Sequence, residues 1–124
     1  MNAVTQSFAV IGALVHIAAF AMESLLLRRP AVQRRFVGHT DVSEQVYLWA
    51  FNQGFYNLFL AAGTIGGLIA YHAGHETAGR AVTLYTCAFM VGAGIVLIAS
   101  DRTRLRAALI QAVPPLIALI AALA

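Results

Sequence analysis

Four apolar stretches, each long enough to cross a lipid bilayer, constrain this chain more than any other feature of its sequence. They occupy residues 7–27, 46–71, 81–100 and 107–124. A helix of about 20 apolar residues spans the hydrocarbon core of a bilayer. Because the stretches take up most of the 124 residues, we expect one domain, residues 1–124, with an all-α fold. That fold is a four-helix transmembrane bundle with no room for an appended catalytic domain.

Composition and charge agree with a membrane protein. Hydrophobic residues make up 60% of the chain and charged residues 10%, which leaves too little polar surface for a water-soluble domain. The net charge of +3 comes from arginine alone, and the arginines lie between the apolar stretches rather than along one exposed face. We therefore expect the lipid bilayer as a partner and no nucleic acid. The single cysteine, Cys87, allows no intramolecular disulfide.

The distribution of arginine predicts an orientation. The first loop contains Arg28, Arg29, Arg34 and Arg35, and the last contains Arg102, Arg104 and Arg106. The middle loop, residues 72–80, contains a single arginine. Because positively charged loops stay on the cytoplasmic side, we expect both termini outside and a multi-pass protein of the bacterial inner (plasma) membrane. Residues 1–6 carry no Lys or Arg, so we expect the first stretch to stay in the mature protein rather than act as a signal peptide.

Local signals indicate where helices begin, end and touch. Pro30 is expected to stop the first helix, and residues 40–44 offer capping side chains just ahead of the second. The pair Pro114–Pro115 is expected to bend the fourth helix and free backbone carbonyls one turn earlier. Gly63 and Gly67 are spaced for close helix contact, and we favour a contact inside the bundle over a dimer interface.

A polar hexad interrupts the second apolar stretch, where a lipid-facing helix would have none. It reads Asn52-Gln53-Gly54-Phe55-Tyr56-Asn57. A bilayer core offers no water to satisfy amides, so these side chains are expected to face the interior of the bundle. Residues four apart are neighbours on a helix, so the four polar side chains form one broad face.

The first stretch carries the matching polar stripe. Gly12, His16, Ala19 and Glu23 step by four, three and four residues and so share one helix face. At ~1.5 Å per residue, Glu23 lies about 6 Å and His16 about 16 Å from the end of the first stretch. The polar side chains of the hexad lie ~10 to 17 Å into the second stretch, and Gln111 lies about 6 Å into the fourth. These depths predict a polar pocket in the cytoplasmic half, lined by the first, second and fourth helices.

Such a pocket has the groups for proton transfer. Burial favours the uncharged form of a carboxylic acid, so Glu23 would act as acid or base with His16 as its partner, and Tyr56 would donate a proton or a hydrogen bond. The candidate catalytic residues are therefore Glu23, His16 and Tyr56. The candidate groups for binding a carbonyl, epoxide or hydroxyl of a substrate are the amides of Asn52, Gln53, Asn57 and Gln111. The alternative is that these side chains only hold helices together.

The polar residues also resemble those of a known family. His16, the Met22-Glu23 pair, Gln111 with the following Pro114, and above all the string N-Q-G-x-Y-N-x-F-L-A-A-G that begins at Asn52 are similar to the small bacterial membrane proteins grouped as domain of unknown function 1304. The resemblance spans nearly the whole chain. It implies a four-helix integral membrane protein of about this length, and it assigns no activity to any residue.

Three functions remain open. The first is a small intramembrane enzyme of isomerase, epimerase or hydrolase type that acts on a lipophilic substrate. The second is a proton-coupled small-molecule transporter or exporter, and the third is a non-catalytic ligand-binding or structural bundle in which the hexad fixes packing. A transporter of this size would need to be a homo-oligomer, and we expect a homo-oligomer. No nucleotide-binding, nucleophile or metal-binding motif is present, so we expect no cofactor and no metal. A pocket filled by side chains would contradict the enzyme hypothesis.

Overall fold

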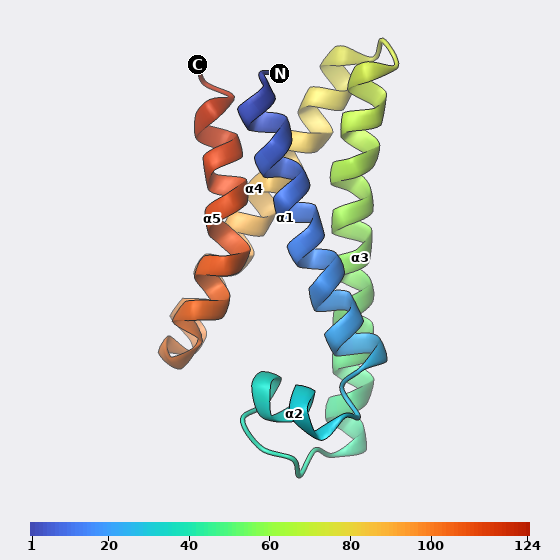
Figure 1. Ribbon diagram of the computed structural model, residues 1–124, viewed down its shortest axis with the longest axis vertical. Coiled ribbons are helices and arrows are strands. Elements are labelled where there is room, and N and C mark those ends of the chain that lie inside the picture. The colour runs from blue at the N-terminus through green and yellow to red at the C-terminus, as the bar shows by residue number, and fades with distance from the viewer.

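The structure is entirely helical. It is a computed structural model that describes all residues from 1 to 124. In chain order its elements are α1 (Ala3–Phe20), the π-helix η1 (Ala21–Leu25), α2 (Pro30–Phe36), α3 (Glu44–His72), α4 (Glu76–Ser100), the short η2 (Arg102–Arg104) and α5 (Leu105–Ala121) (Figure 1). Four helical stretches are long and apolar enough to cross a membrane, namely Ala3–Leu25, Glu44–His72, Glu76–Ser100 and Arg102–Ala121. The predicted all-α fold with four spans is confirmed.

Capping residues extend the helices beyond the apolar stretches. Asn2 caps α1 by accepting a 2.8 Å hydrogen bond from the Thr5 N–H. Ser43, within the expected capping segment, caps α3 by accepting a 3.3 Å bond from the Val46 N–H. Pro30 does not simply stop the first helix, because it occupies the first turn of α2, a helix that the sequence pattern did not predict. Proline fits there, since the first turn of a helix has no intrahelical partner for its backbone N–H groups.

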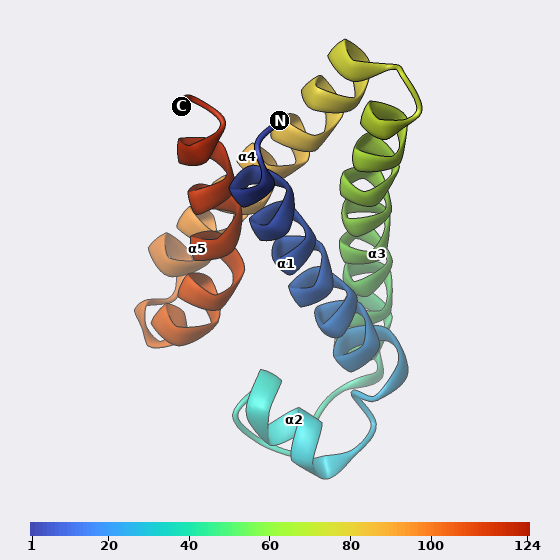
Figure 2. The ribbon, with the colours of Figure 1, turned by 45° about the horizontal axis from the view of Figure 1, so that its top comes forward.

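The four spans cross one another rather than running parallel. Both α1 and α4 pack against α3 and against α5. In Figures 1 and 2 the two termini and the turn between α3 and α4 lie at one end, which we call the terminal end. Toward the other end, which carries α2 and which we call the α2 end, α1 and α3 diverge from α4 and α5 (Figure 1). The bundle therefore has two legs, α1 with α3 and α4 with α5.

Hydrogen bonds between helices close the terminal end. The Met1 amino group donates to the Tyr71 hydroxyl, His72 Nε2 bonds Gln6 Oε1 at 2.6 Å, Asn2 donates to the Ala121 carbonyl at 2.6 Å, and Arg80 donates to the Ala122 carbonyl at 2.8 Å. These bonds join the start of α1 to the ends of α3 and α5, and the start of α4 to the end of α5. The helices are held together where they converge, so any opening lies toward the α2 end.

Close backbone contact at the terminal end depends on glycine. A Cβ atom added to Gly79 of α4 would lie 2.5 Å from the carbonyl oxygen of Gly67 in α3, and one added to Gly67 would lie 2.9 Å from the Thr83 backbone nitrogen. Gly63, one turn away, faces the Thr86 methyl group at 3.3 Å from its own ideal Cβ position. The Gly63 and Gly67 pair thus packs inside the bundle, as expected, and lets α3 and α4 touch.

Replacing Gly79 with alanine is expected to destabilise the protein by about 1 to 3 kcal/mol, because its Cβ would overlap backbone atoms that cannot move aside. Gly66→Ala is the matched control, since nothing lies within 4 Å of that Cβ position and alanine favours a helix. Thermal unfolding in detergent micelles measures both. A Gly79→Ala protein as stable as Gly66→Ala would contradict the close α3–α4 contact.

Candidate functional site

A large cleft opens between the two legs. Its volume is about 1400 Å³, and 24 residues from all four spans and α2 line it, 13 of them hydrophobic. The apolar walls include Leu60 of α3, Phe89 and Leu97 of α4, and Ile110 of α5. Because α5 remains helical through Pro114–Pro115, the carbonyls of residues 110 and 111 lack the donor that a non-proline residue would supply one turn later. The side chains of the bundle do not fill this space.

Six of the seven predicted site residues line the cleft. They are His16 and Glu23 from the first span, Gln53, Tyr56 and Asn57 from α3, and Gln111 from α5. The depth matching therefore placed these three helices correctly around one pocket. The sequence pattern did not point to α4 and α2 as walls, yet both contribute lining residues.

Asn52 is the exception, because the structure does not place it at the cleft. Its side chain is exposed, and its Nδ2 donates a 2.8 Å hydrogen bond to the Leu48 carbonyl of its own helix. Because this amide bonds to the preceding turn of its own helix, it does not connect α3 to another helix. The hexad is therefore not one uniform polar face: Gly54 and Phe55 contact the first span, and three of its residues border the cleft.

Asn57 joins the two ionisable side chains of the first span. Its Oδ1 lies 2.7 Å from His16 Nδ1, and its Nδ2 donates a 2.8 Å hydrogen bond to Glu23 Oε2. His16 is only 2% exposed, whereas Glu23 and Asn57 are half-buried. The expected pairing of Glu23 with His16 is thus indirect, through an amide of α3 that bonds both.

The Asn57 amide determines which nitrogen of the His16 imidazole carries the proton. With Asn57 Nδ2 donating to the carboxyl group, its Oδ1 is the atom that faces His16, so His16 Nδ1 must donate. In the neutral ring the other nitrogen, Nε2, then carries the lone pair. This Nε2 is buried and has no hydrogen-bond partner. The histidine therefore keeps an unused acceptor, the form that a base requires.

Glu23 lies in an irregular turn that the sequence did not predict. Residues Ala21–Leu25 form a π-helix, and the Leu26 N–H reaches the Ala21 carbonyl at 3.0 Å, five residues back. Single π turns recur at functional sites, since the wider turn re-aims its side chains. The only sign of it in the sequence is Gly54 of the hexad, which lies far along the chain and packs against this turn.

Gly54 brings α3 against the η1 turn. A Cβ atom at Gly54 would overlap the Ser24 hydroxyl oxygen and lie 3.1 Å from the Ser24 backbone nitrogen. The same hydroxyl donates a 2.7 Å hydrogen bond to the Phe51 carbonyl of α3. One turn further along α3, this close approach leaves Asn57 within reach of Glu23. Ser24 and Gly54 are thus positioning residues for the carboxyl group.

The other predicted site residues take no part in this hydrogen-bonded chain. Tyr56 is 68% exposed, and no hydrogen bond within the protein involves its hydroxyl or the amides of Gln53 and Gln111. They line the cleft with unused donors and acceptors. No group of three or more His, Cys, Asp or Glu side chains is placed to hold a metal ion.

A comparison with protein families identifies the relatives of this chain. The family model described as protein of unknown function (DUF1304) matches residues 10–123. The chain belongs to the DUF1304 family. No curated protein and no solved structure matches it. The matched region contains His16, Glu23 and Asn57, the last three spans and most of the first, so the residues of this DUF1304 cleft lie within the region that the family model matches.

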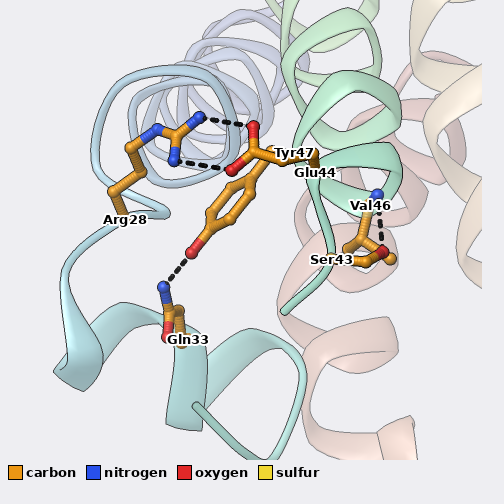
Figure 3. Close-up of polar contacts among 6 residues, drawn as sticks. All are labelled: Arg28, Gln33, Ser43, Glu44, Val46 and Tyr47. Atoms are coloured by element: carbon orange, nitrogen blue, oxygen red, sulfur yellow. Dashed lines mark hydrogen bonds and ion pairs between the residues drawn. The ribbon is translucent and has the colours of Figure 1, made fainter. Parts of the chain in front are cut away.

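A second, smaller cleft lies between the Glu23 turn and the first turns of α3. Its volume is about 440 Å³, and its lining includes Glu23, Arg28, Glu44 and Tyr47. Arg28 donates two hydrogen bonds to Glu44, at 3.2 and 3.0 Å, and its guanidinium lies 4.2 Å from the centre of the Tyr47 ring (Figure 3). Glu23 therefore borders two separate spaces.

The Asn57 bridge predicts a stability loss when it is removed. Asn57→Leu breaks both hydrogen bonds and leaves the buried imidazole and the half-buried carboxyl group without partners, which costs about 1 to 3 kcal/mol for the imidazole and less for the carboxyl group. Asn52→Leu is the matched control, because that side chain bonds only its own helix. Thermal unfolding in detergent compares them. Equal stability of the two variants would show that the bridge does not form.

Proposed function

We propose that this protein is an integral membrane enzyme that binds a small lipophilic substrate in the large cleft and transfers protons through Glu23 and His16. The observation that carries the proposal is the hydrogen-bonded chain His16–Asn57–Glu23 on the wall of a cleft of about 1400 Å³. Titratable groups inside a membrane span are costly and mark functional sites by default. A bundle whose polar groups served packing alone would have no need of an unfilled space beside them.

The chain supplies a base and an acid. His16 Nε2 is the unpartnered acceptor, and Glu23 keeps Oε1 free because only Oε2 is held by Asn57. Because His16 Nε2 is buried, a shift of the side chains that cover it would expose it to the cleft; His16 would then take a proton from one atom of the substrate, and Glu23 as a carboxylic acid would give a proton to another. The proton then returns from the imidazolium to the carboxylate through water at the cleft mouth. Substrate and product differ only in the position of a hydrogen, which is an isomerase or epimerase reaction.

The remaining groups would orient the substrate. The amides of Gln53 and Gln111 and the hydroxyl of Tyr56 line the cleft with no partner in the protein, so they are available to a carbonyl, epoxide or hydroxyl group. Hydrogen bonds to such an oxygen stabilise the negative charge that develops when a neighbouring proton leaves. A hydrolase would use the same groups differently. The base would take a proton from a water molecule, and that water would attack the substrate.

A proton-transferring isomerase exchanges substrate hydrogen with the solvent, and this exchange can be detected even when the substrate is unidentified. We expect purified protein, incubated in D₂O buffer with a bacterial lipid extract, to raise the mass of at least one lipophilic compound by one deuterium. Glu23→Gln keeps the shape of the side chain and should abolish the exchange, a loss of at least about 100-fold for a missing acid. Mass spectrometry of the extract is the readout.

Asn52→Leu is the control for this experiment, since Asn52 lies away from the cleft and should leave the exchange unchanged. Absence of deuterium in every compound, with folded wild-type protein, contradicts the isomerase. Incorporation of ¹⁸O from labelled water into a product would instead identify the hydrolase.

Proton-coupled transport is the second candidate, and one observation favours it. Glu23 borders both the large cleft and the smaller one between the η1 turn and the start of α3. A carboxyl group that reaches two spaces can load a proton from one and release it to the other. Such a path would involve a homo-oligomer, as the size of the chain suggests. Substrate flux that follows a pH gradient across vesicles, and that Glu23→Gln abolishes, would support transport over catalysis.

We also infer the orientation in the bacterial plasma membrane. Arg80 is the single arginine of the terminal end, and the other arginines all belong to the two loops of the α2 end. The positive-inside rule then places α2 and the cleft mouth in the cytoplasm and both termini outside.

A further inference from the structure

Arginines gather at the mouth of the large cleft. Arg35 of α2, Arg104 of η2 and Arg106 of α5 all line it, and they come from three separate elements. Arg29, Arg34 and Arg102 belong to the same two loops but do not line the cleft. The positive-inside rule accounts for arginine in these loops. The rule does not explain why Arg35, Arg104 and Arg106, and not the other loop arginines, line the same cleft.

The positive charge at the mouth is largely uncompensated. The only ion pairs in the structure are Arg28 with Glu44 and Arg104 with Asp101, so Arg35 and Arg106 have no acidic partner. Hydrogen bonds from Thr103, together with Arg104, hold the pKa of Asp101 below its usual range, so Asp101 is a carboxylate at neutral pH and offsets Arg104. Glu23 is the only acidic residue of the lining.

The α2 helix that brings Arg35 to the mouth is fixed in place. Gln33 of α2 is buried and donates a hydrogen bond to the Tyr47 hydroxyl of α3, and Arg28 stacks on the ring of the same tyrosine (Figure 3). Phe36, beside Arg35, also lines the cleft. The guanidinium is thus presented by an anchored helix rather than by a free loop.

Behind the arginines the cleft is long and apolar. On α4 its lining runs from Tyr85 to Ser100, which at ~1.5 Å per residue is about 22 Å. Half the hydrocarbon core of a bilayer is ~15 Å thick, so the cleft can hold a lipid-like chain over most of its length. Cationic groups at the mouth and an apolar interior are complementary to a molecule with an anionic head group and an apolar chain.

We propose that the cleft binds an anionic amphiphile, with its carboxylate or phosphate on Arg35 and Arg106 and its apolar chain between the two legs. Arginine suits both anions, because its planar guanidinium donates two parallel hydrogen bonds. This ligand class specifies the substrate of the proposed enzyme and rests on that proposal, because the reacting carbon of such a chain would lie beside His16 and Glu23. A long-chain carboxylic acid and an anionic phospholipid share this chemistry.

Native mass spectrometry of the protein in a neutral detergent tests the proposal with sodium oleate, oleyl alcohol and phosphatidylglycerol as probes. We expect oleate or phosphatidylglycerol to bind at least about 10-fold more tightly than oleyl alcohol. Arg35→Gln and Arg106→Gln should each weaken the anionic probe by about 10-fold, the loss of one charge-assisted hydrogen-bonded pair. Arg34→Gln and Arg102→Gln remove the same charge from residues outside the lining and should leave binding unchanged.

The results distinguish a free acid from a bilayer lipid as the ligand, and they test ligand binding separately from the proposed catalysis. Selective binding of oleate points to a free acid and that of phosphatidylglycerol to a bilayer lipid, and either supports the anionic amphiphile. Equal binding of oleyl alcohol, or equal losses in Arg34→Gln and Arg35→Gln, overturns it. Binding that depends on Arg35 and Arg106, without deuterium exchange by the wild-type protein, would contradict the enzyme and leave this proposal standing.

Discussion

The close contacts that glycine allows between helices determine the shape of the whole molecule. In a bilayer, helices gain little from hydrophobic burial against one another, so association depends on how closely their backbones approach. At the terminal end, Gly67 and Gly79 join α3 to α4. Toward the α2 end the partners change: Gly54 brings α3 against the first span, and a Cβ on Gly94 would lie 2.7 Å from the Ala112 Cβ of α5. Each helix changes its close partner along its length. The two legs therefore separate toward the α2 end, and the cleft lies between them.

The two legs have different chemistry, and this division follows from the same contacts. The leg of α1 and α3 carries His16, Glu23 and Asn57, whose hydrogen bonds would be unsatisfied if these helices separated. The leg of α4 and α5 meets through small residues such as Gly94 and so faces the cleft with apolar side chains, while its loop adds arginine at the mouth. The proposed acid and base therefore lie on one wall, and the other wall is mostly apolar, with Gln111 as its amide.

Much of this arrangement could be predicted from the sequence, because a membrane makes hydrophobic length and buried polarity unusually informative. The four spans followed from apolar runs, and matching depths along the helices brought His16, Glu23 and Gln111 to one pocket. Depth does not determine rotation, however, and Asn52 turned back onto its own helix. The seven-residue helix α2 has no periodic signal, and its place depends on a tertiary contact with α3. The π turn likewise accompanies the fit of Ser24 against Gly54, a contact between segments far apart in sequence.

The membrane also decides which groups can give the cleft its selectivity. A lipophilic molecule that moves from the bilayer into an apolar cleft exchanges one hydrocarbon environment for another, so its chain contributes little free energy of binding. Every surrounding lipid is a competitor at high local concentration. Discrimination of the proposed ligand must therefore come from the few polar contacts, which are the arginines at the mouth and the hydrogen-bonding groups of the His16–Asn57–Glu23 chain. Since charged groups interact more strongly where water is scarce, these contacts can select one amphiphile among many that would fit the apolar walls equally well.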